Sequence, residues 1–245
     1  ENALMRTIRV HTPAALEAHT EVELDPRASH RLSRVLRRRV GDPVTLFNGD
    51  GREARAELLA VDARCSRVRI EAVVPVDRES PLVVHLVQAV AKGDRMDWVV
   101  QKAVELGVAS IHPVLTEHGD VRLDAARAEK RRQRWQDIVI GACEQCGRAV
   151  VPAVHAPVAL AAWSPPEASG WMLEPEAHEA LGETSPDGAV ALAIGPEGGF
   201  GANDRRLLVG HGYRAVRFGP RVLRTETAGA AALAVLQARY GDLGT

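Results

Sequence analysis

A glycine-rich loop at residues 195–200 carries the clearest chemical signal in the sequence. It follows an apolar run with the length of a buried strand and precedes a helical pattern, and loops in that position bind ligands in open α/β sheets. It lacks the Gly-Lys-Ser/Thr of a Walker loop and the glycine spacing of a dinucleotide site. Because the carboxylate of Glu197 would repel a pyrophosphate, the loop favours a cationic ligand such as S-adenosylmethionine (SAM), with a structural turn as the alternative. Its members are Gly195, Pro196, Glu197, Gly198, Gly199 and Phe200.

A second Gly-Pro loop, residues 219–227, also joins the end of a strand pattern to the start of a helix pattern. Thr225 has the side chain of a helix N-cap, and the negative charge of Glu226 suits the helix dipole. These roles leave Arg221 and Arg224, which bracket an apolar pair, without a structural explanation. Two rigid loops at the same edge of a sheet predict a cleft between them.

A Cys-x-x-Cys pair, Cys143 and Cys146, raises the question of zinc or redox chemistry. We expect no metal site, because the sequence has no second such pair and no histidine pair at zinc-finger spacing. Redox cysteines begin a helix, where the dipole lowers the thiol pKa, whereas this pair ends one. We therefore expect the thiols to pack, with Glu144, Gln145 and Arg148 lining a polar surface.

Two short segments concentrate positive charge in a chain whose net charge is only −1. Local basic patches on a neutral protein bind phosphate without making the whole surface attract nucleic acid. Solvated helix faces are the alternative for both segments. The first cluster contains His30, Arg31, Arg34, Arg37, Arg38 and Arg39. The second contains Arg127, Lys130, Arg131, Arg132 and Arg134.

The first 78 residues have the pattern of a small β-rich domain with one helix. A turn signal, Asn-Gly-Asp-Gly, joins the middle two of four expected strands into a hairpin. Asp25 and Pro26 predict a helix start, and Leu32, Val35 and Leu36 are expected to point inward with the arginines outward. The expected strands are 7–11, 44–47, 53–61 and 67–74. Together these elements predict a small barrel.

The rest of the chain alternates between strand and helix patterns after a proline-flanked linker at 75–81. This alternation predicts an open parallel sheet with helices on both faces. The expected strands are 82–90, 111–115, 171–173, 190–194 and 215–218, and the expected helices are 94–106, 124–145, 203–210 and 225–240. The Ala/Pro-rich stretch 153–169 is expected to be an irregular surface connection.

Bulk properties favour a globular protein over a membrane or secreted one. Hydrophobic residues make up 46% of the chain, yet no apolar run approaches the roughly 20 residues that span a bilayer. No charged-then-apolar signal segment opens the sequence. Three cysteines, an odd number, suit a reducing compartment. We expect a cytoplasmic protein.

Four motifs occur in a fixed order along the chain. They are His30-x4-Val35-Leu36-Arg37-x3-Gly41-Asp42 with the turn at 48–51, residues 91–96 leading into 101–108, residues 142–148 with Pro152, and residues 194–200 paired with 223–228. Each motif is weak alone, but the ordered set covers nearly the whole chain. The set resembles the RsmE family of bacterial 16S rRNA uridine-N3 methyltransferases, within the SPOUT (trefoil-knot) superfamily.

The resemblance implies an α/β protein with two domains. Residues 1–78 would form a PUA-like β-barrel that grips RNA, and residues 79–245 a parallel-sheet α/β trefoil-knot (SPOUT) domain that holds SAM. The resemblance also implies a homodimer with active sites at the subunit interface, and the 16S rRNA of the small ribosomal subunit as the partner. No metal and no membrane is implied.

This hypothesis assigns roles to individual residues. Arg224 or Arg221, with Arg148 contributed by the second subunit as a third candidate, would stabilise the anion formed when uridine N3 loses its proton. Glu144 or Glu226 would accept that proton. The expected cofactor residues are Leu173, Gly195, Pro196, Glu197, Gly198, Gly199, Gly219, Val222, Leu223 and Thr227. The expected RNA contacts are His30, Arg31, Arg34, Arg37, Arg38 and Arg148.

Two alternative functions stay open on the sequence alone. The same fold could methylate another RNA nucleotide, or the chain could be an RNA-binding ribosome-assembly factor without catalysis. The intact loops at 195–199 and 223–227 disfavour the second, and a SAM-binding titration would separate the two classes. An oxidoreductase is disfavoured by the missing phosphate fingerprint, and a serine hydrolase by the missing Gly-x-Ser-x-Gly elbow.

Overall fold

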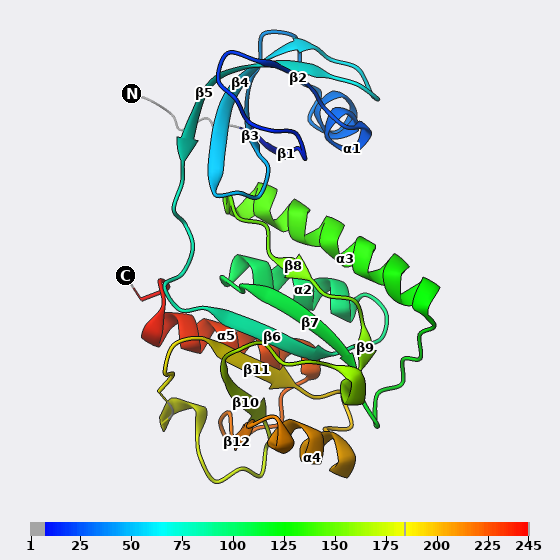
Figure 1. Cartoon of the computed structure of the whole chain (residues 1–245), viewed down its shortest axis with the longest axis vertical. Helices are drawn as coiled ribbons and strands as arrows, with labels where there is room; N and C mark the ends of the chain where they lie inside the picture. Colours follow the sequence, from blue (N-terminus) through cyan, green and yellow to red (C-terminus); the bar gives the residue numbers. More distant parts are fainter. Residues whose placement is uncertain (1–7, 184, 245) are drawn as a thin grey trace. The chain divides into compact units, whose positions relative to one another are not determined.

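The computed structural model describes residues 8–183 and 185–244, which divide into two units (Figure 1). Unit 1 contains the described residues up to 79 together with 140–151, and unit 2 contains 80–139 and the described residues from 152 onward. The 22-residue helix α3 (Ala125–Cys146) therefore gives its last residues to unit 1. Thr7, the expected first residue of the first strand, lies outside the described residues.

Unit 1 is built on a five-stranded sheet with the order β1-β3-β4-β5-β2. Its strands are β1 (Ile8–His11), β2 (Glu21–Glu23), β3 (Pro43–Phe47), β4 (Arg52–Ala60) and β5 (Arg67–Pro75). The predicted hairpin is confirmed, because β3 and β4 pair antiparallel on either side of the turn. The curled sheet encloses a core that includes Leu46, Leu58 and Ile70. The expectation of a small barrel is consistent with this arrangement.

The helical segment of unit 1 begins where the sequence predicts. The Asp25 carboxylate accepts a hydrogen bond from the Ala28 backbone N–H at 2.9 Å and caps α1 (Pro26–His30). A π-helical turn, η1 (Arg31–Val35), follows. Leu32 is buried as expected, but the inward orientation predicted for Val35 is wrong, since its side chain is 63% exposed. The wider π turn rotates Val35 off the buried face that a 3.6-residue repeat assigns to it.

Unit 2 is organised around a parallel sheet with the order β12-β10-β11-β6-β7-β8, and β9 pairs with β7. The strands are β6 (Val84–Ala89), β7 (Ser110–Leu115), β8 (Ala153–Val154), β9 (Val158–Ala159), β10 (Ser169–Leu173), β11 (Val190–Ile194) and β12 (Arg214–Val216). All five residues of β11 are buried. A strand covered on both faces reads as a continuous apolar run, so the predicted open parallel sheet is confirmed.

Helices cover both faces of this sheet. The remaining helical elements are α2 (Arg95–Glu105), α4 (Ala202–Gly210), α5 (Thr225–Tyr240) and the short turns η2 (Leu160–Ala162) and η3 (Leu181–Glu183). Gly229 of α5 faces Leu86, whereas Leu208 of α4 packs in the cluster that contains Val87. Because successive strand side chains point to opposite faces, these two helices lie on opposite sides. No helix among the described residues is long and apolar enough to cross a membrane.

The stretch 153–169 is not an irregular surface connection, so that prediction is wrong. It contains β8, β9 and η2, and it buries the side chains of Leu160 and Trp163. The Trp163 ring meets the Tyr213 ring edge-on, with centroids 6.0 Å apart. Two-residue strands carry too little periodicity to be seen in sequence, and the burial of Trp163 depends on a residue fifty positions away.

Candidate active site

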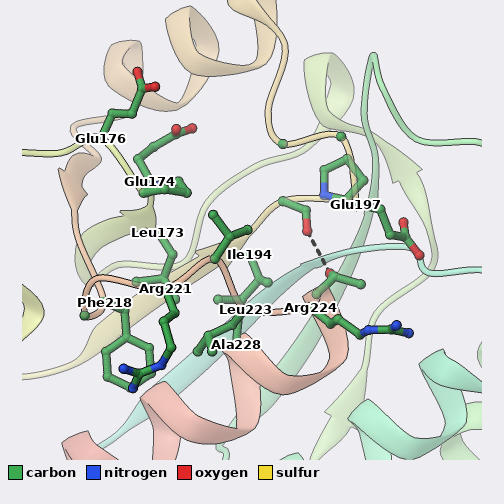
Figure 2. Close-up of a pocket in the computed structure, with 18 of the residues that line it drawn as sticks. Leu173, Glu174, Glu176, Ile194, Glu197, Phe218, Arg221, Leu223, Arg224 and Ala228 are labelled. Atoms are coloured by element: carbon green, nitrogen blue, oxygen red, sulfur yellow. Dashed lines mark hydrogen bonds between the residues drawn. The ribbon is translucent and has the colours of Figure 1, made fainter.

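A pocket of about 560 Å³ lies in unit 2 where β10 and β11 end (Figure 2). Its walls are formed by the residues at and after the end of β10, those at and after the end of β11, the loop before α5 with the start of that helix, and Arg205 of α4. Its size is typical of a small-molecule site, and the carboxyl edge of a parallel sheet is where such sites occur. The lining residues are Leu173 to Glu176, Ile194 to Gly199, Arg205, Phe218, Gly219, Arg221 to Thr225 and Ala228.

The loop at 195–200 folds tightly because of its glycines. The Gly199 backbone N–H donates to the Pro196 carbonyl oxygen at 2.9 Å and closes a turn. Gly199 has φ +72°, a conformation that other residues rarely adopt. A Cβ atom on Gly195 would lie 3.2 Å from the backbone nitrogen of Phe200. Residues with larger side chains would therefore open this turn and change the wall of the pocket.

A buried relay of hydrogen bonds ties the two Gly-Pro loops together. Gln88 Nε2 donates to Thr225 Oγ1 at 2.9 Å. The Thr225 hydroxyl in turn donates to the Gly195 carbonyl oxygen at 2.7 Å, the bond drawn as a dashed line in Figure 2. The Gln88 side chain is fully buried on β6. Sequence reasoning missed Gln88, although a glutamine inside the apolar run 82–90 is a visible signal. The predicted N-cap role of Thr225 is wrong: Thr225 is the first helical residue, and its hydroxyl bonds the neighbouring loop instead.

Arg221 and Arg224 bring positive charge to the pocket. Both side chains are exposed, and neither guanidinium has an ion-pair or hydrogen-bond partner among the described residues. In Figure 2, Arg221 extends on the side of Phe218, and Arg224 extends on the opposite side of the loop. Unpaired guanidinium groups can stabilise negative charge that develops on a bound substrate.

Arg95, the first residue of α2, pairs with carboxylates from both loops. Its Nη1 lies 2.5 Å from Glu197 Oε1, and its Nε lies 3.9 Å from Glu226 Oε1. The other carboxylate oxygen of Glu226 is buried and has no hydrogen-bond partner among the described residues. No individual role for Arg95 could be assigned from the sequence, because nothing local to it reveals these two partners. Arg95 thus links the two loops through ion pairs.

The residues that follow β10 add further carboxylates to the pocket wall. Glu174 accepts two hydrogen bonds from Arg205, at 2.9 and 3.1 Å, which raise the pKa of Arg205. Glu176 is exposed and lines the same wall. Sequence reasoning missed both carboxylates. Their position directly after the predicted strand 171–173 was the available signal, because ligands bind at that edge.

Glu144 and Arg148 lie in unit 1 and do not line the pocket. The Glu144 side chain is completely buried and pairs with Arg27 at 3.3 Å and with Arg31 at 3.2 Å. Arg148 is also buried and pairs with Glu79. Glu144 and Arg148 are therefore each held by ion pairs within unit 1.

The basic segment of unit 1 extends over α1, η1 and the turn that follows. His30, Arg34, Arg37 and Arg38 are exposed, whereas Arg31 is half-buried against Glu144. Arg38 has a distant ion pair with Asp42 at 3.9 Å. Most of the expected RNA contacts are thus available to a ligand of this unit.

The Cys-x-x-Cys pair has no reactive environment. The Cys143 thiol is buried and lies 3.7 Å from the Val150 carbonyl oxygen. Burial raises the pKa of this thiol to about 12, so it stays protonated. The expected packing of Cys143 is confirmed, and Cys146 is half-buried. Among residues 8–183 and 185–244, no group of His, Cys, Asp and Glu side chains is arranged to hold a metal ion.

The pocket suits a ligand with a flat apolar part and a positive charge. Leu173, Ile194 and Leu223 supply apolar walls, and the loop at 195–199 offers backbone groups that are not covered by large side chains. The exposed carboxylate of Glu176 would attract a cationic group. The residues present therefore fit a nucleoside that bears a sulfonium or ammonium group.

Comparison with known proteins gives consistent matches. A family model described as an RNA methyltransferase domain matches residues 78–237. The ribosomal RNA small subunit methyltransferase E of Buchnera aphidicola subsp. Schizaphis graminum is 31% identical over 242 residues, covering 97% of this chain and 98% of the relative. The Bacillus subtilis protein of the same name is also 31% identical, covering 84% and 86%.

Two solved structures match almost the entire chain. The ribosomal RNA small subunit methyltransferase E of Neisseria gonorrhoeae, bound to S-adenosyl methionine, aligns with a TM-score of 0.90 at 38% identity, covering 97% of this chain and 99% of that one. A Legionella pneumophila protein in complex with the cofactor SAM aligns with a TM-score of 0.93 at 44% identity, covering 97% and 100%.

Proposed function

The chain belongs to the RNA methyltransferase family, and we propose that it transfers a methyl group from SAM to N3 of a uridine in 16S rRNA. Its relatives over nearly the full length are small subunit methyltransferases E, whose family places the target at position 1498 in standard rRNA numbering. The expected fold class, an α/β SPOUT domain with a small N-terminal barrel, is confirmed. The pocket between the two Gly-Pro loops is the observation that carries the proposal.

SAM is the cofactor that fits this pocket. When bound, it supplies an electrophilic methyl group on a sulfonium. The loop at 195–199 would hold it through backbone groups, and Leu173, Val222 and Leu223 through apolar contacts. Gly219 lines the same space, whereas Thr227 does not line the pocket and is proposed as a neighbouring contact. The Gln88 relay would keep the two loops at a fixed separation.

The chain's own side chains would handle the proton and the charge on the target base. Uridine N3 carries a proton in the neutral base, so a nucleophilic N3 requires its removal. Of the two proposed proton acceptors, Glu226 is favoured over Glu144. Glu226 adjoins the pocket loop, and one of its carboxylate oxygens has no hydrogen-bond partner among the described residues. Glu144 instead forms ion pairs with two arginines in unit 1. Arg224 or Arg221 would stabilise the anion on the flanking carbonyl oxygens.

We assign RNA binding to the N-terminal domain and propose a homodimer as the working form. Residues 1–78 would grip the RNA through His30, Arg34, Arg37 and Arg38, and residues 79–245 would hold SAM. The 81% exposure of Val222, an apolar side chain at the pocket, favours coverage by a second copy of the chain. As a partner of ribosomal subunits, the protein would act in the cytoplasm.

The decisive experiment is a nucleoside analysis. The protein and SAM are incubated with small ribosomal subunits that lack the modification, and the digested rRNA is examined by mass spectrometry. We expect 3-methyluridine. A different methylated nucleoside would show that the chain is a SAM-dependent RNA methyltransferase with another target nucleotide. No SAM binding at all would refute the proposal.

A further inference from the structure

A basic groove runs along the amino-terminal half of α3 in unit 2. This groove, called here the α3 groove, has a volume of about 720 Å³. Its cationic lining side chains are Arg122, Arg127, Lys130, Arg131 and Arg134. The last four follow the i, i+3, i+4, i+7 spacing of one helix face, so they form a stripe with about 5.4 Å between turns. The buried side chain of Trp135 lies about a quarter turn around α3 from this stripe and anchors the helix.

The positive charges of the α3 groove are only partly compensated. Arg134 pairs with Asp97, and Arg127 pairs with Asp124 at 3.4 Å. Lys130 and Arg131 have no carboxylate partner among the described residues. Lys130 is exposed and Arg131 is half-buried, and a cation without a carboxylate partner is available to an incoming anion. The lining also includes two carboxylates, Glu129, which pairs with Arg132, and Asp137. Five cationic side chains against these two leave the groove with excess positive charge.

The first turn of α2 connects the α3 groove to the active site. Arg95 pairs with Glu197 of the glycine-rich loop, while the neighbouring Asp94 and Asp97 pair with Arg134 of the groove. One helical turn thus borders both features within unit 2. A polymer that lies in the groove would pass beside the loop that lines the pocket.

The chemistry of the groove favours a phosphate backbone as its ligand. Leu123 is the one apolar residue in the described lining, and that lining contains no aromatic ring. Protein interfaces concentrate their binding energy in buried aromatic and apolar anchors, and single-strand readers stack bases on aromatic rings. Neither is present here. Arginine and lysine on an exposed face instead bind phosphates without reading bases.

We propose that the α3 groove is a second RNA-binding surface, which holds the phosphate backbone of the substrate RNA beside the active site. This inference rests on the proposed function, since it takes RNA as the partner. It adds a contact surface in unit 2 to the basic segment of unit 1. Lys130 and Arg131 are the two residues on which the contact depends most.

Charge reversal tests the α3 groove. The full-length variant Lys130→Glu/Arg131→Glu is compared with Arg206→Glu/Arg214→Glu, a control with the same change in net charge on the exposed surface of α4 and β12. Binding of a 16S rRNA fragment is measured over a range of salt concentrations. We expect the groove variant to bind roughly tenfold more weakly near ~0.15 M salt and its salt slope to fall by about 1.5, because about two phosphate contacts are lost. The control should keep the wild-type slope.

Other results would overturn the inference or separate it from the proposed function. A groove variant with the same affinity and slope as the control would refute the groove while leaving methylation in place. Failure of the wild-type chain to bind the RNA would refute the proposed function and the groove together, whereas RNA binding without methylation would refute the proposed function alone. Saturating SAM binding by both variants verifies that each is folded. Loss of binding to an acidic peptide without loss of RNA binding would assign the groove to a protein partner instead.

Discussion

The side-chain amide of Gln88 lies 2.9 Å from the Thr225 hydroxyl, and through that hydroxyl a fully buried strand residue holds the carbonyl oxygen of Gly195 in the pocket. The hydroxyl can donate only one hydrogen, so its donation to Gly195 leaves its lone pair to accept from Gln88. The position of β6 is thereby transmitted to both Gly-Pro loops. Gln88 is a positioning residue for the pocket.

Replacement of Gln88 by leucine should weaken both SAM binding and the fold. We expect about tenfold lower affinity and a loss of about 1–3 kcal/mol in the free energy of unfolding, because a buried hydrogen bond is lost. Gln237→Leu is the matched control, since Gln237 is equally buried and hydrogen-bonds Gly107 and Leu82 at the far end of α5. Calorimetric titration should show unchanged SAM affinity for the control. Equal affinity losses in both variants would reduce Gln88 to a purely structural role.

Arg224→Ala should abolish methylation while SAM binding is partly retained. The exposed guanidinium has no structural partner among the described residues. Its removal should therefore weaken the stabilisation of the developing negative charge without lowering the stability of the fold. We expect kcat to fall by about 100-fold or more. Single-turnover methylation at saturating SAM measures this, with Arg221→Ala alongside. Retained turnover in Arg224→Ala would exclude Arg224 from the mechanism.

Glu226→Gln and Glu144→Gln should fail in different ways. Because Glu226 adjoins the pocket loop, we expect the Glu226→Gln substitution to lower kcat without a large effect on the free energy of unfolding. Glu144 is buried between Arg27 and Arg31, so its neutralisation should lower the free energy of unfolding by about 1–3 kcal/mol. Urea unfolding and kcat per folded protein are measured for both. A large fall in kcat for folded Glu144→Gln would restore Glu144 as the proton acceptor.

The stability of unit 2 should decrease in mild acid because of His112. Its ring stacks on His155 at 4.0 Å, and burial, with the charges of His155 and His85, lowers the pKa of His112 from 6.5 to about 3. The unfolded chain therefore binds more protons than the folded one between these values. The contribution of neutral His112 to the free energy of unfolding is full above about pH 6.5. It falls as the pH drops, by roughly 2 kcal/mol at pH 5.

Urea unfolding at pH 7 and pH 5 checks this dependence. His112→Gln removes the titrating ring, so the difference between the two pH values should shrink in that variant. His85 also has a lowered pKa, caused by burial and by His155, and should leave a smaller residual dependence. An unchanged difference in His112→Gln would contradict the assignment.

Local sequence patterns predicted the features that depend on neighbours along the chain. The apolar run of β11, the Asp25 cap of α1 and the two Gly-Pro loops could be identified because strand period, capping and glycine geometry act over a few residues. The parallel sheet then followed, since alternating strands and helices can bury their apolar faces in few ways. These patterns also placed both loops at one edge of the sheet.

Only the tertiary structure decided which polar groups meet. Gln88 and Thr225 are separated by more than a hundred positions, as are Arg95 and Glu197, and their contacts exist because non-adjacent strands and helices converge at one sheet edge. The partners of Glu144 depend in the same way on where the end of α3 lies in unit 1. Periodicity reports which face of an element is buried, whereas hydrogen bonds and ion pairs across elements are set by packing in three dimensions. That is why the sequence located the pocket but did not reveal the relay that holds its loops.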